Sequence, residues 1–261
     1  MNSYEEKTKQ KLTEVFTAME TPEKWTEYKK EQIRSVVGDI EQKKCDDFAD
    51  FLNKRFLDAV KINNGIEINR IWHTLSDSEK LKFAERIANT LIDLLKSDIR
   101  NNRVTVYKND GDVYTPTNDT FDMIFKQETT NYIDTLKITT HPTNRALMHV
   151  SMDKKLGINL NWELYKSMGI FLMDLRHEMM HVVDMFIPQI SALKPDVRTK
   201  SIRYYVNNEV DRDLYENNPL EVNANLKRRE FRKMYDAMIT QDVLNQVNNY
   251  TIQQYKQNVR A

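Results

Sequence analysis

Two stripes of apolar residues at helical spacing run through residues 1–100. They comprise Phe48, Phe51, Leu52, Phe56, Leu57 and Val60, and then Leu81, Ala84, Ile87, Leu91 and Leu94. Such spacing is typical of helices that bury one face in a core. The pattern therefore predicts a mostly helical N-terminal region over residues 1–100.

Two polar motifs in this region indicate where helices begin. Thr21 directly precedes Pro22, which is the arrangement of an N-cap followed by proline at the first helical position. Ser76 and Glu79 have the spacing of a capping box, in which each side chain bonds to the other residue's backbone N–H. Helices are therefore predicted to start at both positions.

Near residue 103 the helical spacing of apolar residues ends, and a region of predicted strands and helices begins. Residues 104–114 alternate around an Asp110-Gly111 turn, which predicts a hairpin, and short strands are expected within 121–125, 132–139 and 146–152. Helical spacing returns after Gly157 and stops before Pro188, and a last helical stretch is expected to open at Asn218-Pro219. The predicted fold class is α+β, divided into a helical region, 1–100, and a catalytic region, 101–261.

Composition excludes several classes of function. The 261 residues include 39 basic and 39 acidic side chains, so the formal charge is 39 − 39 = 0 and gives no footprint for nucleic acid. Five glycines cannot assemble a glycine-rich phosphate loop, and one cysteine excludes an internal disulfide. No apolar run approaches the ~18 residues of a membrane span, and the first residues lack the layout of a secretory signal. We therefore expect a cytoplasmic protein without nucleic-acid or membrane partners, the alternative being an effector delivered by a non-classical route; the oligomeric state is not indicated.

The residues that carry chemistry lie in the sequence His177-Glu178-Met179-Met180-His181. On a helix, side chains four residues apart share one face, so His177 and His181 can bind one metal ion. Glu178 lies about 100° round the helix, where it can take a proton from metal-bound water. This pattern, on an otherwise apolar helix, predicts a single catalytic zinc ion with Glu178 as the general base.

A zinc site needs a third protein ligand, and several carboxylates compete for that role. Glu221 is the preferred candidate because Asn218 and Pro219 place it in the first turn of a helix, although it could instead complete a capping box with Asn218. Asp184 is the main rival, but the role expected for it is support of a histidine ligand or simple solvation. Glu209 and Glu216 are weaker substitutes.

A His-Glu-x-x-His helix followed by a helix with an early Glu resembles the gluzincin branch of the zincin metallopeptidases over about residues 120–240. The Asn-Pro-Leu-Glu opening is also similar to that of small zincin-type peptidases inferred in bacteria and phages. The resemblance implies zinc bound by His177, His181 and Glu221, with Glu178 as general base and a protein or peptide as substrate. It also implies a substrate-binding strand at 145–152 and an insertion at 188–217 that shapes the cleft. In the family, an acidic residue one turn after the third ligand often supports a histidine ligand, and this chain has Asn225 at that position.

The oxyanion of the reaction needs a hydrogen-bond donor, and the sequence leaves four candidates: Tyr204, Tyr205, Tyr215 and His149. A di-iron site is excluded because no other histidine has a glutamate three residues before it. The basic run at 226–233 is expected to be a solvated helix face. The predicted function is a zinc-dependent metallopeptidase; the alternative is a non-catalytic interaction or effector module whose helix binds a structural metal.

Overall fold

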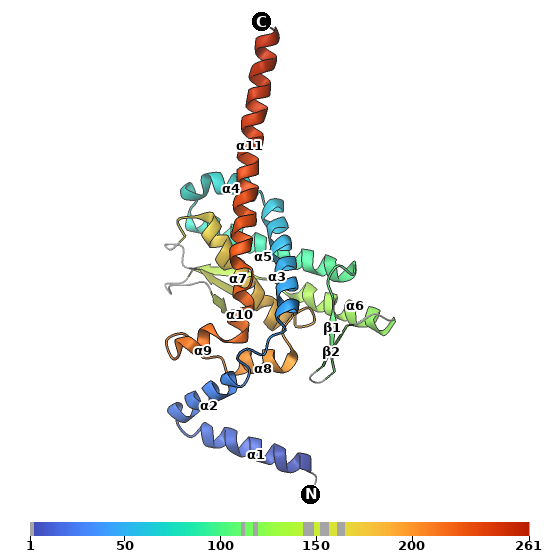
Figure 1. The fold of residues 1–261 in the computed structure, drawn as a ribbon, viewed down its shortest axis with the longest axis vertical. Helices are drawn as coiled ribbons and strands as arrows, with labels where there is room; N and C mark the ends of the chain where they lie inside the picture. The colour runs from blue at the N-terminus through green and yellow to red at the C-terminus, as the bar shows by residue number, and fades with distance from the viewer. Residues whose placement is uncertain are drawn as a thin grey trace.

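The computed structural model describes residues 3–110, 113–116, 120–142, 149–151, 157–160 and 165–260. Helices dominate, and two small sheets complete an α+β fold (Figure 1). The helices are α1 (Ser3–Ala18), α2 (Pro22–Arg34), α3 (Gln42–Ile62), α4 (Gly65–Ile71), the 3-10 helix η1 (Trp72–Thr74), α5 (Asp77–Arg100), α6 (Thr120–Thr135), α7 (Met168–Phe186), α8 (Pro195–Arg203), α9 (Arg212–Glu216), α10 (Pro219–Asn225) and α11 (Arg228–Arg260).

The helical prediction for the N-terminal region is confirmed, including both starts. The Thr21 side chain accepts a hydrogen bond from the Lys24 N–H, and Ser76 forms the full capping box with Glu79. The long helices α3 and α5 pack side by side through the two predicted stripes. Their contact also includes the buried Asp98 of α5, which accepts hydrogen bonds from Arg55 of α3 at 2.5 and 2.8 Å.

The main core draws on residues from both sides of position 100. Buried side chains of α3 and α5 form one hydrophobic cluster with those of α7, α10 and α11. Helix α7 is the centre of this cluster, because apolar residues cover nearly its whole circumference and fourteen of its residues are buried. The N-terminal helices thus support the helix that carries the His-Glu-x-x-His sequence, whereas the division into two domains stays a prediction.

The strands that the structure describes are short, and not all of them lie where they were expected. The hairpin is confirmed, with β1 (Tyr107–Asp110) antiparallel to β2 (Val113–Pro116), and its turn residues lie outside the described residues. A second sheet has the order β3-β5-β4, in which β5 (Gly157–Leu160) is parallel to β3 (Thr139–Pro142) and antiparallel to β4 (His149–Ser151). Of the predicted substrate-binding strand, 145–152, only β4 is described, at the edge of the described part of the sheet.

One element type and two helix boundaries were predicted incorrectly. Residues 121–125 and 132–135 belong to α6, where Thr129, Thr130 and Ile133 are buried at helical spacing, because short apolar runs do not distinguish helix from strand. The helical segment expected from Gly157 begins only at Met168, since β5 comes first. The last helical stretch is two helices, because Lys227 adopts a left-handed backbone with φ 55° between α10 and α11.

The C-terminal part has two further features. Much of the basic run at 226–233 is paired: Lys227 with Asp50, Arg228 with Asp174 and Arg232 with Asp236. Helix α11 continues past the body as a long projection (Figure 1).

Within the described ranges, no helix has the length and apolar character needed to cross a membrane.

Candidate metal centre

The two histidines lie one turn apart in the middle of the buried helix α7. Their exposed fractions are 9% for His177 and 6% for His181, and their rings are perpendicular with centroids 4.7 Å apart. The two Nε2 atoms are 3.1 Å apart. Helical geometry and burial together therefore direct both Nε2 atoms to one point.

Glu221 meets the histidines from α10, forty residues further along the chain. Asn218 caps this helix, because its side chain accepts a hydrogen bond from the Leu220 N–H, and Pro219 occupies the first helical position. Glu221 follows in the first turn with an exposed fraction of 3%. Its Oε2 is 3.3 Å from the His177 Nε2 and its Oε1 is 3.3 Å from the His181 Nε2.

The separations between these donor atoms fit a metal ion. Two atoms that are each about 2.0–2.1 Å from one tetrahedral zinc ion lie about 3.3 Å from each other. The separations of 3.1, 3.3 and 3.3 Å among the two Nε2 atoms and the Glu221 oxygens are close to that value. His177, His181 and Glu221 therefore form a group that could hold a metal ion.

The protonation states within the group follow from burial and mutual contact. Burial would raise the pKa of Glu221, but hydrogen bonds from the two imidazoles outweigh it and lower that pKa, so Glu221 is a carboxylate. Burial lowers the pKa of His177 and favours its neutral form. Burial acts the same way on His181, but the hydrogen bond with Glu221 and the charge of Glu178 outweigh it and raise the His181 pKa. A carboxylate and a neutral imidazole are the forms that bind metal.

Asp184 holds α10 against α7 and is not a ligand. It is fully buried, and its carboxylate accepts hydrogen bonds from Ser191 Oγ at 2.6 Å and from Asn223 Nδ2 at 2.8 Å. The predicted support of a histidine is not observed, because neither the His177 nor the His181 Nδ1 has a hydrogen-bond partner within the part of the chain that the structure describes.

A second buried polar group, Arg176, also joins α7 to α10. Arg176, with no exposed surface, donates to the Ala224 carbonyl at 2.6 Å and to Asn53 Oδ1 at 2.8 Å. Asn53 in turn donates to the Lys227 carbonyl at 3.0 Å. The anchor therefore satisfies carbonyls at and beyond the C-terminal end of α10, while Asn223 binds Asp184. This anchor was not predicted, although an arginine such as Arg176 within an otherwise apolar helix is a visible signal of a buried polar contact.

The weaker ligand candidates, Glu209 and Glu216, are not part of the ligand group. Glu209 is exposed, and Glu216 accepts a hydrogen bond from Arg212 at 2.7 Å. Asn225 does not support a histidine, because it is exposed and accepts from Arg228 at 3.3 Å. Among the carboxylates predicted as alternatives, Glu221 is the one brought to both histidines.

The ligand group opens onto a cleft of about 450 Å³. Its lining residues are Asp174, His177, Glu178, Tyr215, Glu216, Glu221, Asn225 and Arg228. Glu178 is therefore beside the ligands and faces the same space, although only 7% of it is exposed. Tyr215 and Glu216 come from 188–217, so that segment does shape the cleft.

The four predicted oxyanion donors occupy different places. Tyr205 donates a hydrogen bond from Oη to Glu221 Oε1 at 2.7 Å, and burial raises its pKa. Tyr215 lines the cleft, and burial raises its pKa to about 12, which keeps the phenol protonated. Tyr204 packs edge-on against Tyr28 at 5.7 Å, away from the ligands, and the side chain of His149 is outside what the structure describes.

No family model matches this chain, and neither the curated proteins nor the solved structures contain a significantly similar one. The candidate centre therefore depends on its own geometry.

Proposed function

We propose that this protein is a zinc-dependent metallopeptidase of the gluzincin type. The observation that carries the proposal is the convergence of His177, His181 and Glu221 from two helices, with Nε2–carboxylate distances of 3.3 Å, beside a cleft that Glu178 also lines. A bound zinc ion would polarise the scissile carbonyl and make the attacking water more acidic.

Two side chains of the cleft would then perform the proton transfers and the charge stabilisation, and a third residue, Tyr205, would support the ligand Glu221. Glu178 accepts the proton of the attacking water and later delivers it to the leaving amine. Tyr215 remains protonated at neutral pH, so its hydroxyl is the donor best placed for the oxyanion. Tyr205 orients the third ligand through its hydrogen bond to Glu221.

An open cleft supports a catalytic centre over the alternative of a structural metal. Structural zinc sites fill all four positions with protein side chains, whereas catalytic sites retain one for water or substrate. Within the described residues, the group contains three ligands, and the adjoining cleft has a volume of about 450 Å³.

The test separates metal binding from catalysis by substituting Glu178 with Gln. The E178Q variant should retain about one zinc ion per chain by elemental analysis, because it keeps all three ligands. Its cleavage of an unbiased peptide library should fall about 10²–10⁴-fold, which is the usual contribution of a general base.

The matched control is E209Q, which makes the same chemical change at an exposed glutamate outside the cleft. We expect it to cleave like the wild type. Wild-type cleavage by E178Q would exclude Glu178 as the base. Zinc uptake without cleavage of any peptide would favour the non-catalytic module, and failure to bind zinc would exclude both functions.

A further inference from the structure

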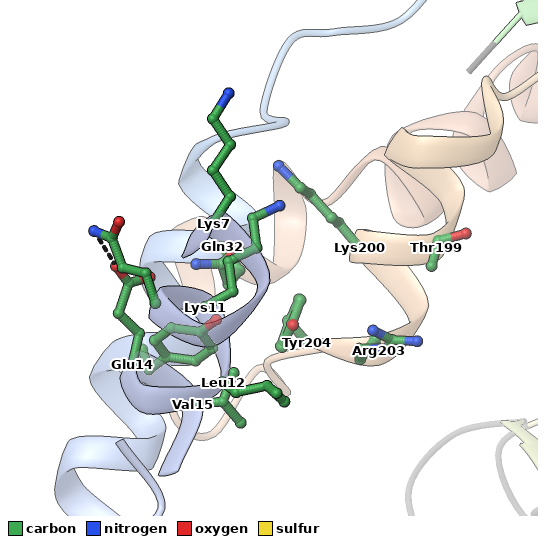
Figure 2. Close-up of a pocket in the computed structure, with 12 residues that line it drawn as sticks. Lys7, Lys11, Leu12, Glu14, Val15, Gln32, Thr199, Lys200, Arg203 and Tyr204 are labelled. Atoms are coloured by element: carbon green, nitrogen blue, oxygen red, sulfur yellow. Dashed lines mark hydrogen bonds between the residues drawn. The ribbon is translucent and has the colours of Figure 1, made fainter. Parts of the chain in front are cut away.

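A second cavity lies between the N-terminal helices and α8. It has a volume of about 730 Å³ and is lined by residues of α1, α2 and α8 together with Tyr204. Figure 2 shows α1 and α2 on one side and α8 on the other, with Lys200 extending across from α8. Segments nearly 190 residues apart in the chain, such as Lys11 and Lys200, thus form one groove.

The groove concentrates positive charge on a chain whose net charge is zero. Four cations line it (Lys7, Lys11, Lys200 and Arg203), against one carboxylate, Glu14, which accepts a hydrogen bond from Gln10. Across the described ranges, none of these four cations has an ion pair with an acidic residue. Lys200 Nζ instead donates to Ser35 Oγ at 3.1 Å.

The spacing of the cations suits an extended acidic peptide. Lys7 and Lys11 are one turn apart on α1, which separates them by about 6 Å along the helix. In an extended peptide, side chains of every second residue lie on one face and repeat at about 7 Å. Carboxylates at alternate positions can therefore pair with the lysines of α1, while Lys200 and Arg203 face the other edge.

The aromatic residues favour a peptide over a nucleic acid. Single-stranded nucleic acid needs ring faces on which bases can stack. Here Tyr28 stacks on Trp25 with centroids 5.6 Å apart, and Tyr204 packs edge-on against both rings. These rings are engaged with one another and do not form a stacking platform.

The groove is connected to the metal centre through consecutive residues. Tyr204 lines the groove, whereas Tyr205 donates its hydrogen bond to the third ligand, Glu221. Because neighbouring Cα atoms are about 3.8 Å apart, the wall of the groove and the support of the ligand belong to one short segment.

We propose that the groove between α1, α2 and α8 is an exosite that binds an acidic, extended segment of the protein substrate. This inference rests on the proposed peptidase function. Cations on two walls hold the acidic segment, and the scissile bond lies in the separate cleft beside Glu178. The expected substrates carry clustered Asp or Glu residues at a distance from the cleaved bond.

The first experiment measures binding by the full chain, without requiring catalysis. A fluorescent peptide alternating Glu and Ser should bind to the wild type, and the matched Gln-Ser peptide should not. The double variant K11Q/K200Q should weaken binding of the acidic peptide about tenfold, since it removes one cation from each wall. The control K9Q changes another exposed lysine of α1 that does not line the groove and should bind as the wild type does.

The second experiment measures cleavage of one library-derived substrate with and without an acidic extension. The double variant should raise KM for the extended substrate about tenfold without changing kcat, and should cleave the short substrate normally. Equal binding of both fluorescent peptides, or unchanged binding by K11Q/K200Q, would refute the exosite. Tighter binding of a single-stranded oligonucleotide than of the acidic peptide would also refute it. Acidic-peptide binding without any cleavage would contradict the peptidase function and leave the groove as an acidic-peptide site. Cleavage without acidic-peptide binding would refute the exosite and leave the peptidase function standing.

Discussion

The hydrogen bond between Tyr205 and Glu221 provides the sharpest test of the metal centre. Substituting Tyr205 with Phe removes one hydroxyl and keeps the ring, which packs at 6.0 Å from that of Tyr215. The hydroxyl donates to an ionised carboxylate at 2.7 Å, and Glu221 is only 3% exposed. Water therefore has little access to replace the lost donor.

The expected loss follows from the kind of contact removed. A hydrogen bond to a charged group contributes about 1.5–3 kcal/mol, and loss of a group that orients a metal ligand commonly weakens affinity about 10–100-fold. That factor corresponds to about 1.4–2.7 kcal/mol. For 261 residues, the entropy of unfolding is about 0.55 kcal/mol/K, so the zinc-induced rise in Tm should shrink by about 3–5 °C.

Zinc affinity is measured by competition with a zinc-binding indicator, and Tm by thermal unfolding with and without zinc. The control is Y204F, the same change at the adjacent tyrosine, which packs against Trp25 and Tyr28. It should leave zinc affinity unchanged. If Y205F bound zinc as tightly as Y204F and had the same zinc-induced rise in Tm, Tyr205 would not orient Glu221.

Three further predictions concern the scaffold. A Cβ added to Gly65 would lie 2.2 Å from Val60 Cγ1 and 2.8 Å from its carbonyl oxygen, so G65A should destabilise the fold by about 1–3 kcal/mol in urea unfolding; unchanged stability would contradict this geometry. Burial raises the pKa of Cys45 to about 12, so at pH 9 only about 0.1% of this thiol is thiolate. A thiol reagent should therefore label Cys45 only as the chain unfolds, and rapid labelling of the native protein would disprove this. S76A should cost about 1 kcal/mol in thermal unfolding through loss of the N-cap, whereas S78A should cost little; equal effects would argue against the cap.

Local chemistry determined which parts of the fold could be predicted from the sequence. The caps at Thr21 and Ser76 were identified correctly because each contact spans three residues. The helix α6 was misread as strand because a short apolar run is compatible with both states until its tertiary neighbours are known, and α6 packs against α5. The break at Lys227 has neither Pro nor Gly to signal it.

The same limit applies to the candidate site. His177, Glu178 and His181 follow from helical spacing alone, and the capped helix start made Glu221 a reasonable candidate. The contact between Tyr205 and Glu221 could not be read from the sequence, because the two residues are sixteen positions apart and no motif links them. Residues that a local motif or a helix cap marks were found, whereas contacts that no such motif marks were missed.

The position of α10 is set by buried polar contacts more than by apolar packing. Apolar surfaces tolerate small shifts of one helix along another, whereas a buried donor that loses its acceptor costs about 1–3 kcal/mol. Arg176 and Asp184 lie eight residues apart on α7 and bind Ala224 and Asn223, which are adjacent on α10. Any slide of α10 would break both contacts in the dry interior. Burying Arg176 and Asp184 within α7 costs free energy. The same two groups hold α10 in place and so keep Glu221 within 3.3 Å of both imidazoles.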